Sequence, residues 1–287
     1  MRRRGFSLTE GLVMMGIVSI SLALLLPAAQ QYRQDARKMV CKNNLKMFGL
    51  ALHNYHDTHG SFPPAFVSVP GTPGSGPRFG WQAMVLPYMD QAPLYNQLNF
   101  SSPLPDPKDR VMQQVIKSYR CPSDPTPAAN PLRGGYGTSN YSGNYGHLPA
   151  RLAPLGTSDF WPGAVESPMT SSGLFARNSR VGLRDITDGT SNTLMVAERG
   201  FSSGSAIWAG VTDSGHEDDA VTDGSHRSRP NAGLSSFSGN HSGGIHILLG
   251  DGSVRFIDNS IESRPGEEMG TWQKLCSKDD GMPIGEF

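Results

Sequence analysis

The hydrophobic pattern of the first 60 residues divides into two parts. Residues 11–32 contain no charged side chain, and about 20 apolar residues are enough to span a bilayer as a helix. Beyond residue 40 the apolar positions recur at spacings of four and three, which is typical of one stripe on an amphipathic helix. The pattern predicts one long helix within residues 6–60, membrane-spanning over 11–32 and packed on a sheet in its second half. The packed stripe consists of Cys41, Leu45, Phe48, Leu52 and Tyr55.

The helix is expected to end where a loop-rich region begins. Gly60 is a natural C-cap, and Pro63-Pro64 prevents the helix from continuing. In residues 61–287, Pro, Gly and Ser interrupt almost every short apolar stretch, which is typical of short elements joined by turns. We therefore expect an α+β fold, in which the long helix packs on an antiparallel β-sheet that carries loop-rich insertions.

The clearest strand signal lies near the C-terminus, in residues 245–257. Two apolar runs, Ile245–Leu249 and Val254–Ile257, flank an Asp251-Gly252 pair. An Asp-Gly pair between apolar runs is the strongest short-range signal for a β-hairpin. Another strand is expected at Leu194–Ala197, after a turn.

Composition and charge narrow the function classes. The 287 residues include 34 Gly and 22 Pro, and 37% are hydrophobic, so long surface loops are expected. Lys and Arg balance Asp and Glu at 25 each, so no basic field exists to hold nucleic acid by its phosphates. The balance is uneven, because residues 1–60 carry eight basic and three acidic residues. A basic N-terminal segment joined to a mildly acidic body is a clue to where in the cell the protein is located.

Two interpretations of the apolar run are open. A secretory signal peptide would be cleaved at an Ala-x-Ala-like site after the run. Here the run continues through Pro27 into the amphipathic helix, which favours a retained helix. Glu10 points the same way, since a carboxylate carried to the bilayer centre costs roughly 2.5–3.5 kcal/mol and usually has a partner. Arg2, Arg3 and Arg4 precede the run, so the positive-inside rule places the N-terminus in the cytoplasm and the body outside.

The segment Arg2–Glu10 resembles the leader of type IV prepilins, with a basic stretch, Gly5, Phe6 and then Glu10 before the apolar run. The resemblance implies that a prepilin peptidase/methyltransferase cuts after Gly5 and methylates the new N-terminal Phe6. It implies that Glu10 neutralises the amino terminus of a neighbouring subunit. The expected protein is a pilin-like or pseudopilin-like bacterial inner-membrane subunit, without enzymatic activity. It would span the membrane once, place its head in the periplasm or outside the cell, and assemble with other pilin-like subunits.

A second resemblance covers nearly the whole chain. The pattern His241, nine residues, then Asp251-Gly252, here called the H-X9-DG segment, is similar to the C-terminal segment of the bacterial DUF1559 family. Shorter matching motifs lie at residues 43–46, 53–57, 61–64, 86–88, 121–124 and 188–193. The resemblance implies a pseudopilin-like protein with a large, loop-elaborated head, and it carries no established biochemical activity.

Three groups of side chains are candidate sites in the head. His241 and Asp251 could meet across the hairpin, together with Asp258, either as structural turn residues or as ligands. Related pseudopilins of secretion systems hold calcium in a C-terminal loop, and oxygen ligands suit calcium. If these three residues bind an ion, calcium is therefore the candidate; apart from it, no cofactor is expected. The acidic stretch 213–223 fits no EF-hand spacing and is expected to be a solvated loop. His53, His56 and His59 fan across the end of the helix without an H-E-x-x-H motif, so helix-end contacts are favoured over metal binding.

The three cysteines, Cys41, Cys121 and Cys276, allow three pairings, and none belongs to a C-x-x-C motif. Disulfides persist outside the cytoplasm, where the head is expected. In the resembling family Cys41 and Cys121 both lie inside recurrent motifs, so the resemblance favours a bond between them and a reduced Cys276.

Two further function classes stay open beside the filament subunit. A membrane-anchored binding module would use the head without polymerising. A serine hydrolase would use Ser202, because residues 200–204 fit the pattern G-x-S-x-G. That motif requires a helix directly after the serine, whereas residues 205–210 are typical of a strand, so hydrolysis is the remote alternative.

Overall fold

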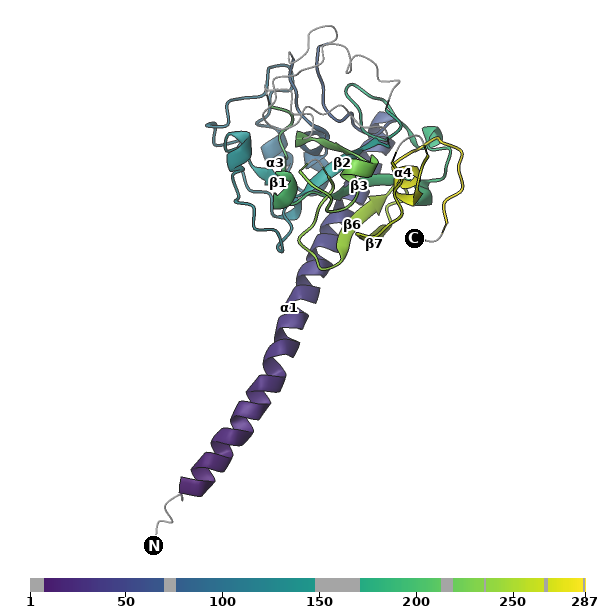
Figure 1. The fold of residues 1–287 in the computed structure, drawn as a ribbon. Coiled ribbons are helices and arrows are strands. Elements are labelled where there is room, and N and C mark those ends of the chain that lie inside the picture. The colour runs from purple at the N-terminus through teal and green to yellow at the C-terminus, as the bar shows by residue number, and fades with distance from the viewer. Residues whose placement is uncertain are drawn as a thin grey trace.

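The computed structural model describes residues 8–69, 76–147, 171–212, 219–234, 236–265, 268–285 and 287. Its dominant element is the helix α1, Leu8–His59, which has 52 residues and is about 78 Å long at 1.5 Å per residue. Figure 1 shows the first part of α1 projecting away from a loop-rich head, while its last turns run into the head. The helix ends as expected, since Gly60 adopts a left-handed conformation with φ of 75° and donates its amide to the His56 carbonyl.

The expected apolar stripe of α1 is confirmed. Cys41, Leu45, Phe48 and Leu52 are fully buried, and Tyr55 packs at the edge of the core. The projecting part of α1 differs, because its described apolar side chains from Leu12 to Ile20 are more than half exposed.

The expected membrane span falls on residues 11–32, which are helical. Within the part of the chain that the structure describes, no helix meets the length and apolarity needed to cross a membrane. The expected span includes Leu22 and residues 24–29, whose side chains the structure does not describe.

The head contains a mixed five-stranded sheet in the order β5-β2-β3-β6-β7. The expected α+β fold with its long N-terminal helix is confirmed. The pairs β2–β3, β3–β6 and β6–β7 are antiparallel as expected, but β2 and β5 are parallel, so the sheet as a whole is mixed. A parallel neighbour requires a long connection, and here the chain passes through two other strands between β2 and β5. The strands are β2 (Tyr141–Gly146), β3 (Leu194–Glu198), β5 (Val221–Asp223), β6 (Gly244–Leu249) and β7 (Val254–Asp258).

The remaining elements are short. Strands β1 (Thr138–Ser139) and β4 (Ala206–Ile207) form a separate antiparallel pair. Helices α2 (Trp81–Met84), α3 (Ala92–Tyr95) and α4 (Thr271–Leu275) have one turn or little more. Single 3₁₀ turns occupy Leu86–Met89, Lys117–Tyr119, Pro131–Arg133, Leu183–Asp185, Thr190–Asn192, Phe201–Ser203 and His226–Ser228.

The sheet separates two hydrophobic clusters. The larger cluster surrounds Phe48 of α1, whose ring lies 5.3 Å from Trp81, 4.8 Å from Tyr119 and 5.2 Å from Tyr141, centre to centre. The smaller cluster contains alternate residues of β6 together with Trp272 of α4. All six residues of β6 are buried, which is the burial expected of a strand covered on both faces. Strand β6 thus lies in the interior of the fold, whereas β7 forms an edge of the sheet with mostly exposed residues. The hairpin β6–β7 lies next to the lower end of the docked helix (Figure 1).

Candidate functional site

A disulfide fastens α1 to the head. Cys41 and Cys121 are bonded with a Cα–Cα distance of 5.3 Å, well inside the usual limit of about 7 Å. Both cysteines are buried, and among the side chains of α1 that the structure describes, Cys41 is the first that is fully buried. This is the pairing that the family resemblance favours. Cys276 is free and buried, and burial raises the pKa of its thiol well above the usual value.

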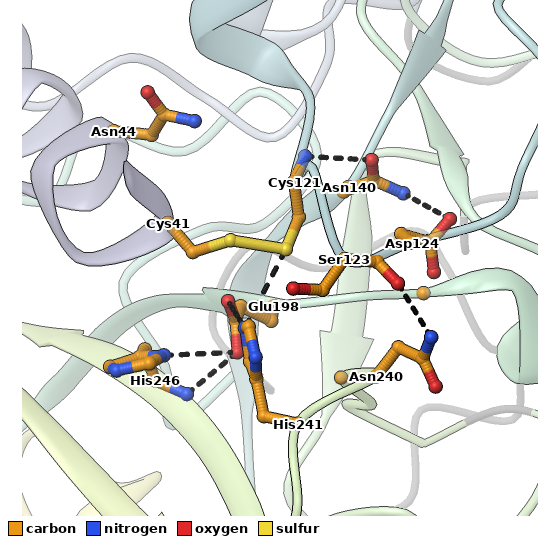
Figure 2. A network of polar contacts seen from close by, with 12 residues as sticks. Cys41, Asn44, Cys121, Ser123, Asp124, Asn140, Glu198, Asn240, His241 and His246 are labelled. Carbon is orange, nitrogen blue, oxygen red and sulfur yellow. Dashed lines mark hydrogen bonds and ion pairs between the residues drawn. A yellow bond between two sulfur atoms is a disulfide. The ribbon is translucent and has the colours of Figure 1, made fainter. Parts of the chain in front are cut away.

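A buried carboxylate lies beside this disulfide. Glu198 ends strand β3, and its side chain is 2% exposed. One carboxylate oxygen is 3.0 Å from Nε2 of His241, and that same nitrogen is 3.5 Å from Sγ of Cys121. The other oxygen accepts a hydrogen bond of 2.8 Å from the His246 amide. Figure 2 shows both histidines converging on Glu198 directly below the disulfide. We call Cys41, Cys121, Glu198, His241 and His246 the disulfide cluster.

The two imidazoles determine the charge state of this carboxylate. Burial alone would raise the pKa of the Glu198 carboxyl, as expected for a charge removed from water. The hydrogen bond from His241 and the nearby imidazole of His246 outweigh burial, so the Glu198 pKa lies below its usual value. Nδ1 of His246 is 3.5 Å from the carboxylate, and the two imidazole rings meet edge to face at 5.1 Å. The cluster therefore holds an ionised carboxylate in a buried place.

The motif at residues 121–124 shapes the loop around the disulfide. The Cys121 amide donates to Oδ1 of Asn140, whose Nδ2 donates to Asp124. Asp124 also accepts hydrogen bonds from the amides of Thr126 and Phe201. These contacts satisfy buried polar groups (Figure 2) and fix the position of the Cys121 backbone.

The other end of the H-X9-DG segment contacts α1 directly. At the hairpin tip, the Asp251 amide donates to the Thr190 carbonyl, and Gly252 has φ of 82°. A Cβ built on Gly49 of α1 would lie 3.4 Å from Cα of Gly252 and 3.0 Å from a methyl carbon of Leu248. The tip therefore packs against a glycine of the helix, where no larger side chain fits without movement. The segment is thus linked to the docked helix at both ends: Gly252 packs directly against Gly49, and His241 contacts Cys121, which the disulfide joins to Cys41 of the helix.

The structure does not bring His241 and Asp251 together, so of the two alternatives for these residues and Asp258 the described contacts favour the structural one, in which Asp251 and Gly252 form the turn. His241 contacts Glu198, whereas the exposed Asp251 accepts from the Ser253 amide. Asp258 is also exposed, and its hydrogen bonds from Ser260 lower its pKa. Strand β6 separates the hairpin base from its tip by about 20 Å, at roughly 3.4 Å per residue. These three side chains therefore share no calcium site.

The acidic stretch is only partly described, and its described members are not solvated. Asp219 is fully buried in an ion pair with Arg133 and accepts hydrogen bonds from Thr212. Asp223 is 3% exposed, and burial raises the pKa of its carboxyl. The expectation of a solvated loop is wrong for these two residues, because they fix strand β5 and its approach. Residues 213–218 lie outside the described residues.

The remaining sequence candidates lie apart from the disulfide cluster. Nε2 of His56 accepts from the Leu183 amide, and the His59 ring stacks on Tyr55 at 4.0 Å, so these two histidines make helix-end contacts. Ser202 is exposed in a 3₁₀ turn that leads to strand β4 rather than to a helix. Gly5 and Phe6 lie outside the described residues, as does the side chain of Glu10.

Sequence reasoning missed Glu198 and His246. The predicted strand stopped at Ala197, one residue before Glu198, because a charged residue is normally a surface residue. A signal was present nonetheless, since Glu198 continues an apolar strand without a turn residue. His246 lies within the apolar run of β6, and the apolar residues on both sides of it drew attention to the strand rather than to the histidine.

The disulfide cluster contains side chains of the types that bind metal ions. One atom each from Cys41, Cys121, Glu198 and His241 lies within 4.8 Å of the others, and all four residues are buried. In the present state the two sulfurs are bonded to each other. The cluster thus serves as a covalent and polar junction between α1, strand β3 and the base of the hairpin.

The fold and this junction define an α+β head fastened by a disulfide to a long, projecting N-terminal helix. The chain belongs to the family described as "Protein of unknown function (DUF1559)", which matches residues 30–264. The expected family is therefore confirmed, over a range that begins after the prepilin-like segment. No curated protein and no solved structure matches the chain significantly.

Proposed function

We propose that this chain is a pilin-like or pseudopilin-like membrane-held subunit that assembles into a type IV pilus-like or type II secretion-like filament. In this proposal α1 supplies both the membrane anchor and the packing surface of the filament. The head is displayed on the periplasmic or extracellular side. The partners are other pilin-like subunits and a prepilin peptidase/methyltransferase.

The observation that carries the proposal is the exposed apolar surface of the projecting helix. Its large apolar side chains occur at consecutive positions, so they point to every side of the helix rather than along one stripe. A helix that is apolar all round requires lipid or other protein around it. The exposed members are Leu12, Val13, Met14, Met15, Ile17, Val18 and Ile20.

Two further features support an exported head. The disulfide between Cys41 and Cys121 is of the kind that persists in oxidising compartments. The three arginines before α1 would retain the N-terminus on the cytoplasmic side. Both features agree with a single pass through the inner membrane.

Glu10 provides the test of assembly. In a filament its carboxylate would meet the amine of Phe6 on an adjacent subunit, and removing one partner of a buried pair costs on the order of 3–5 kcal/mol. Glu10→Leu should therefore abolish sheared filaments and cross-linked ladders at equal membrane abundance. The matched control is Asp35→Leu, which removes an exposed carboxylate from the same helix and should leave the ladders intact.

Intact mass of the membrane-extracted protein tests the processing. The proposal expects cleavage after Gly5 and one added methyl group on Phe6. A mature chain that begins near Gln30, or equal ladders from wild type and Glu10→Leu, would contradict the filament proposal.

A second candidate function is a membrane-anchored binding module. It is favoured by an open cavity of about 450 Å³ beside the end of α1, with Tyr55, His59 and Arg180 in its lining. A cavity of this size is in the range of small-molecule sites. Equal ladders in the Glu10 experiment would favour this candidate over the filament subunit.

A further inference from the structure

We propose that, once the Cys41–Cys121 bond is reduced, the disulfide cluster becomes a binding site for one divalent cation of the zinc class. The ligands would be the two cysteine sulfurs, Nε2 of His241 and one carboxylate oxygen of Glu198. The proposal goes beyond the filament function and does not depend on it. The protein would then have two mutually exclusive states. In one state Cys41 and Cys121 are joined by the disulfide, and in the other they both bind the metal ion.

The first support is distance. Tetrahedral zinc sites place sulfur at about 2.3 Å and nitrogen or oxygen at about 2.0–2.2 Å, so ligand atoms lie roughly 3.3–3.8 Å from each other. Nε2 of His241 is already 3.0 Å from the Glu198 carboxylate and 3.5 Å from Sγ of Cys121. All four ligand atoms lie within 4.8 Å of one another. The sulfurs need to separate after reduction, which side-chain rotation at a Cα–Cα distance of 5.3 Å allows.

The second support is the donor set. Two thiolates, one imidazole and one carboxylate are ligand types that zinc accepts, and sulfur ligands disfavour calcium and magnesium. The four residues are buried, so water competes weakly for the ion. A cation at this place would also compensate the buried charge of Glu198.

The third support is the set of contacts behind the ligands. The oxygen of Glu198 that faces away from His241 accepts from the His246 amide at 2.8 Å. The backbone of Cys121 is held by the Asn140 side chain at 2.9 Å. Contacts of this kind orient the ligands of metal sites, and their loss typically lowers metal affinity 10–100-fold.

The conversion between the two states balances through thiol–disulfide exchange. A dithiol reductant supplies two electrons and two protons, its own sulfurs become a disulfide, and Cys41 and Cys121 become thiols. Binding of the cation then releases the thiol protons to solvent, so affinity falls as the pH falls. In the reverse exchange a small-molecule or protein disulfide accepts the two electrons, takes up two protons and becomes a dithiol, while the Cys41–Cys121 bond re-forms and the ion is released.

The experiment uses the full chain, purified in detergent either with the disulfide intact or under a phosphine reductant. Each form is titrated with Co²⁺ and then with Zn²⁺. We expect one ion per reduced chain, a thiolate-to-cobalt charge-transfer absorption that zinc abolishes, and at least tenfold weaker binding to the oxidised chain. This comparison needs no substitution, so it is independent of variant folding.

Variants locate the site. Glu198→Gln and His241→Gln should each lower the affinity of the reduced chain at least tenfold, with helix content monitored by circular dichroism. Cys276→Ser removes the free thiol and should leave binding unchanged. Absence of stoichiometric binding by the reduced chain, equal binding by the oxidised chain, or loss of binding in Cys276→Ser would overturn the proposal. The filament proposal would be unaffected, because its test depends on Glu10.

Discussion

Between residues 41 and 59, α1 buries one stripe of apolar side chains under the head, whereas from Leu12 to Ile20 its described apolar side chains are more than half exposed. The backbone is helical in both parts. The docked part alternates apolar and polar residues at helical spacing, and the projecting part is apolar on every side. The docked part therefore has its partner within the chain, whereas no described residue of the chain covers the apolar side chains of the projecting part.

Removing the projecting part should give the largest effect. A chain that begins at Gln30 loses the exposed apolar surface but keeps the whole stripe and the family-matched range. We expect it to be monodisperse without detergent and to unfold within a few degrees of the full chain. Light scattering with size-exclusion chromatography and a thermal melt check both outcomes. A shortened chain that aggregates or melts without cooperativity would contradict the division of α1 into a docked part that the head needs and a projecting part that it does not need.

Within the docked part, Phe48 is the largest fully buried side chain of the stripe. Phe48→Ala should lower the free energy of unfolding by about 3–5 kcal/mol, because a cavity remains among three aromatic rings. Leu50→Ala is the matched control, since Leu50 lies two residues away and is 65% exposed. It should change the free energy by less than about 0.5 kcal/mol. Urea unfolding of both variants measures the difference.

Substitutions at two glycines of α1, one in the docked part and one in the projecting part, test the difference between the two parts further. Gly49→Leu should cost about 1–3 kcal/mol, because the new side chain collides with Leu248 and with the hairpin tip at Gly252. A Cβ built on Gly16 would meet no described atom within 4 Å apart from the neighbouring backbone of its own helix. Gly16→Leu should therefore leave the stability of the head unchanged. Equal effects of the two substitutions on urea unfolding would mean that the tip does not rest on the helix.

The smallest expected effect concerns pH. The ionised form of Glu198 is favoured in the folded, disulfide-bonded chain, so its contribution to stability is present above the unfolded pKa of about 4.3. That contribution is lost as the pH falls through the lower folded pKa. Urea unfolding from pH 7 to pH 3 should show a loss of stability below about pH 4.3 that Glu198→Gln reduces. Glu268→Gln, at an exposed residue, should keep the wild-type slope; a slope unchanged by Glu198→Gln would contradict the argument.

Local patterns sufficed to predict the docked stripe of α1, its end at Gly60 and the β6–β7 hairpin. In each case one short segment contains the whole signal: a helical spacing, a C-cap or an Asp-Gly turn. The Cys41–Cys121 pairing came from the family resemblance, because three cysteines alone leave the choice open.

The failures share a different physical cause. The parallel pairing of β2 with β5 joins strands about 80 residues apart, and no local pattern encodes such a partner. The buried positions of Glu198 and Asp219 depend on His241 and Arg133, which only tertiary packing brings to them. His241 was singled out from the sequence, but its partners were sought in a loop backbone or in Asp251, whereas the structure pairs it with Glu198 of a neighbouring strand.

The disulfide has a mechanical consequence. A pulling force along α1 enters the head at Cys41 and passes through the sulfur–sulfur bond to Cys121, which lies 80 residues further along the chain. The residues between the two cysteines are bypassed by this load path and cannot be extended while the bond is intact. At roughly 3.4 Å per residue, about 270 Å of chain is withheld from stretching. The last turns of the helix, and the residues Trp81 and Tyr119 that pack on Phe48, are therefore shielded from tension applied through the projecting part of α1.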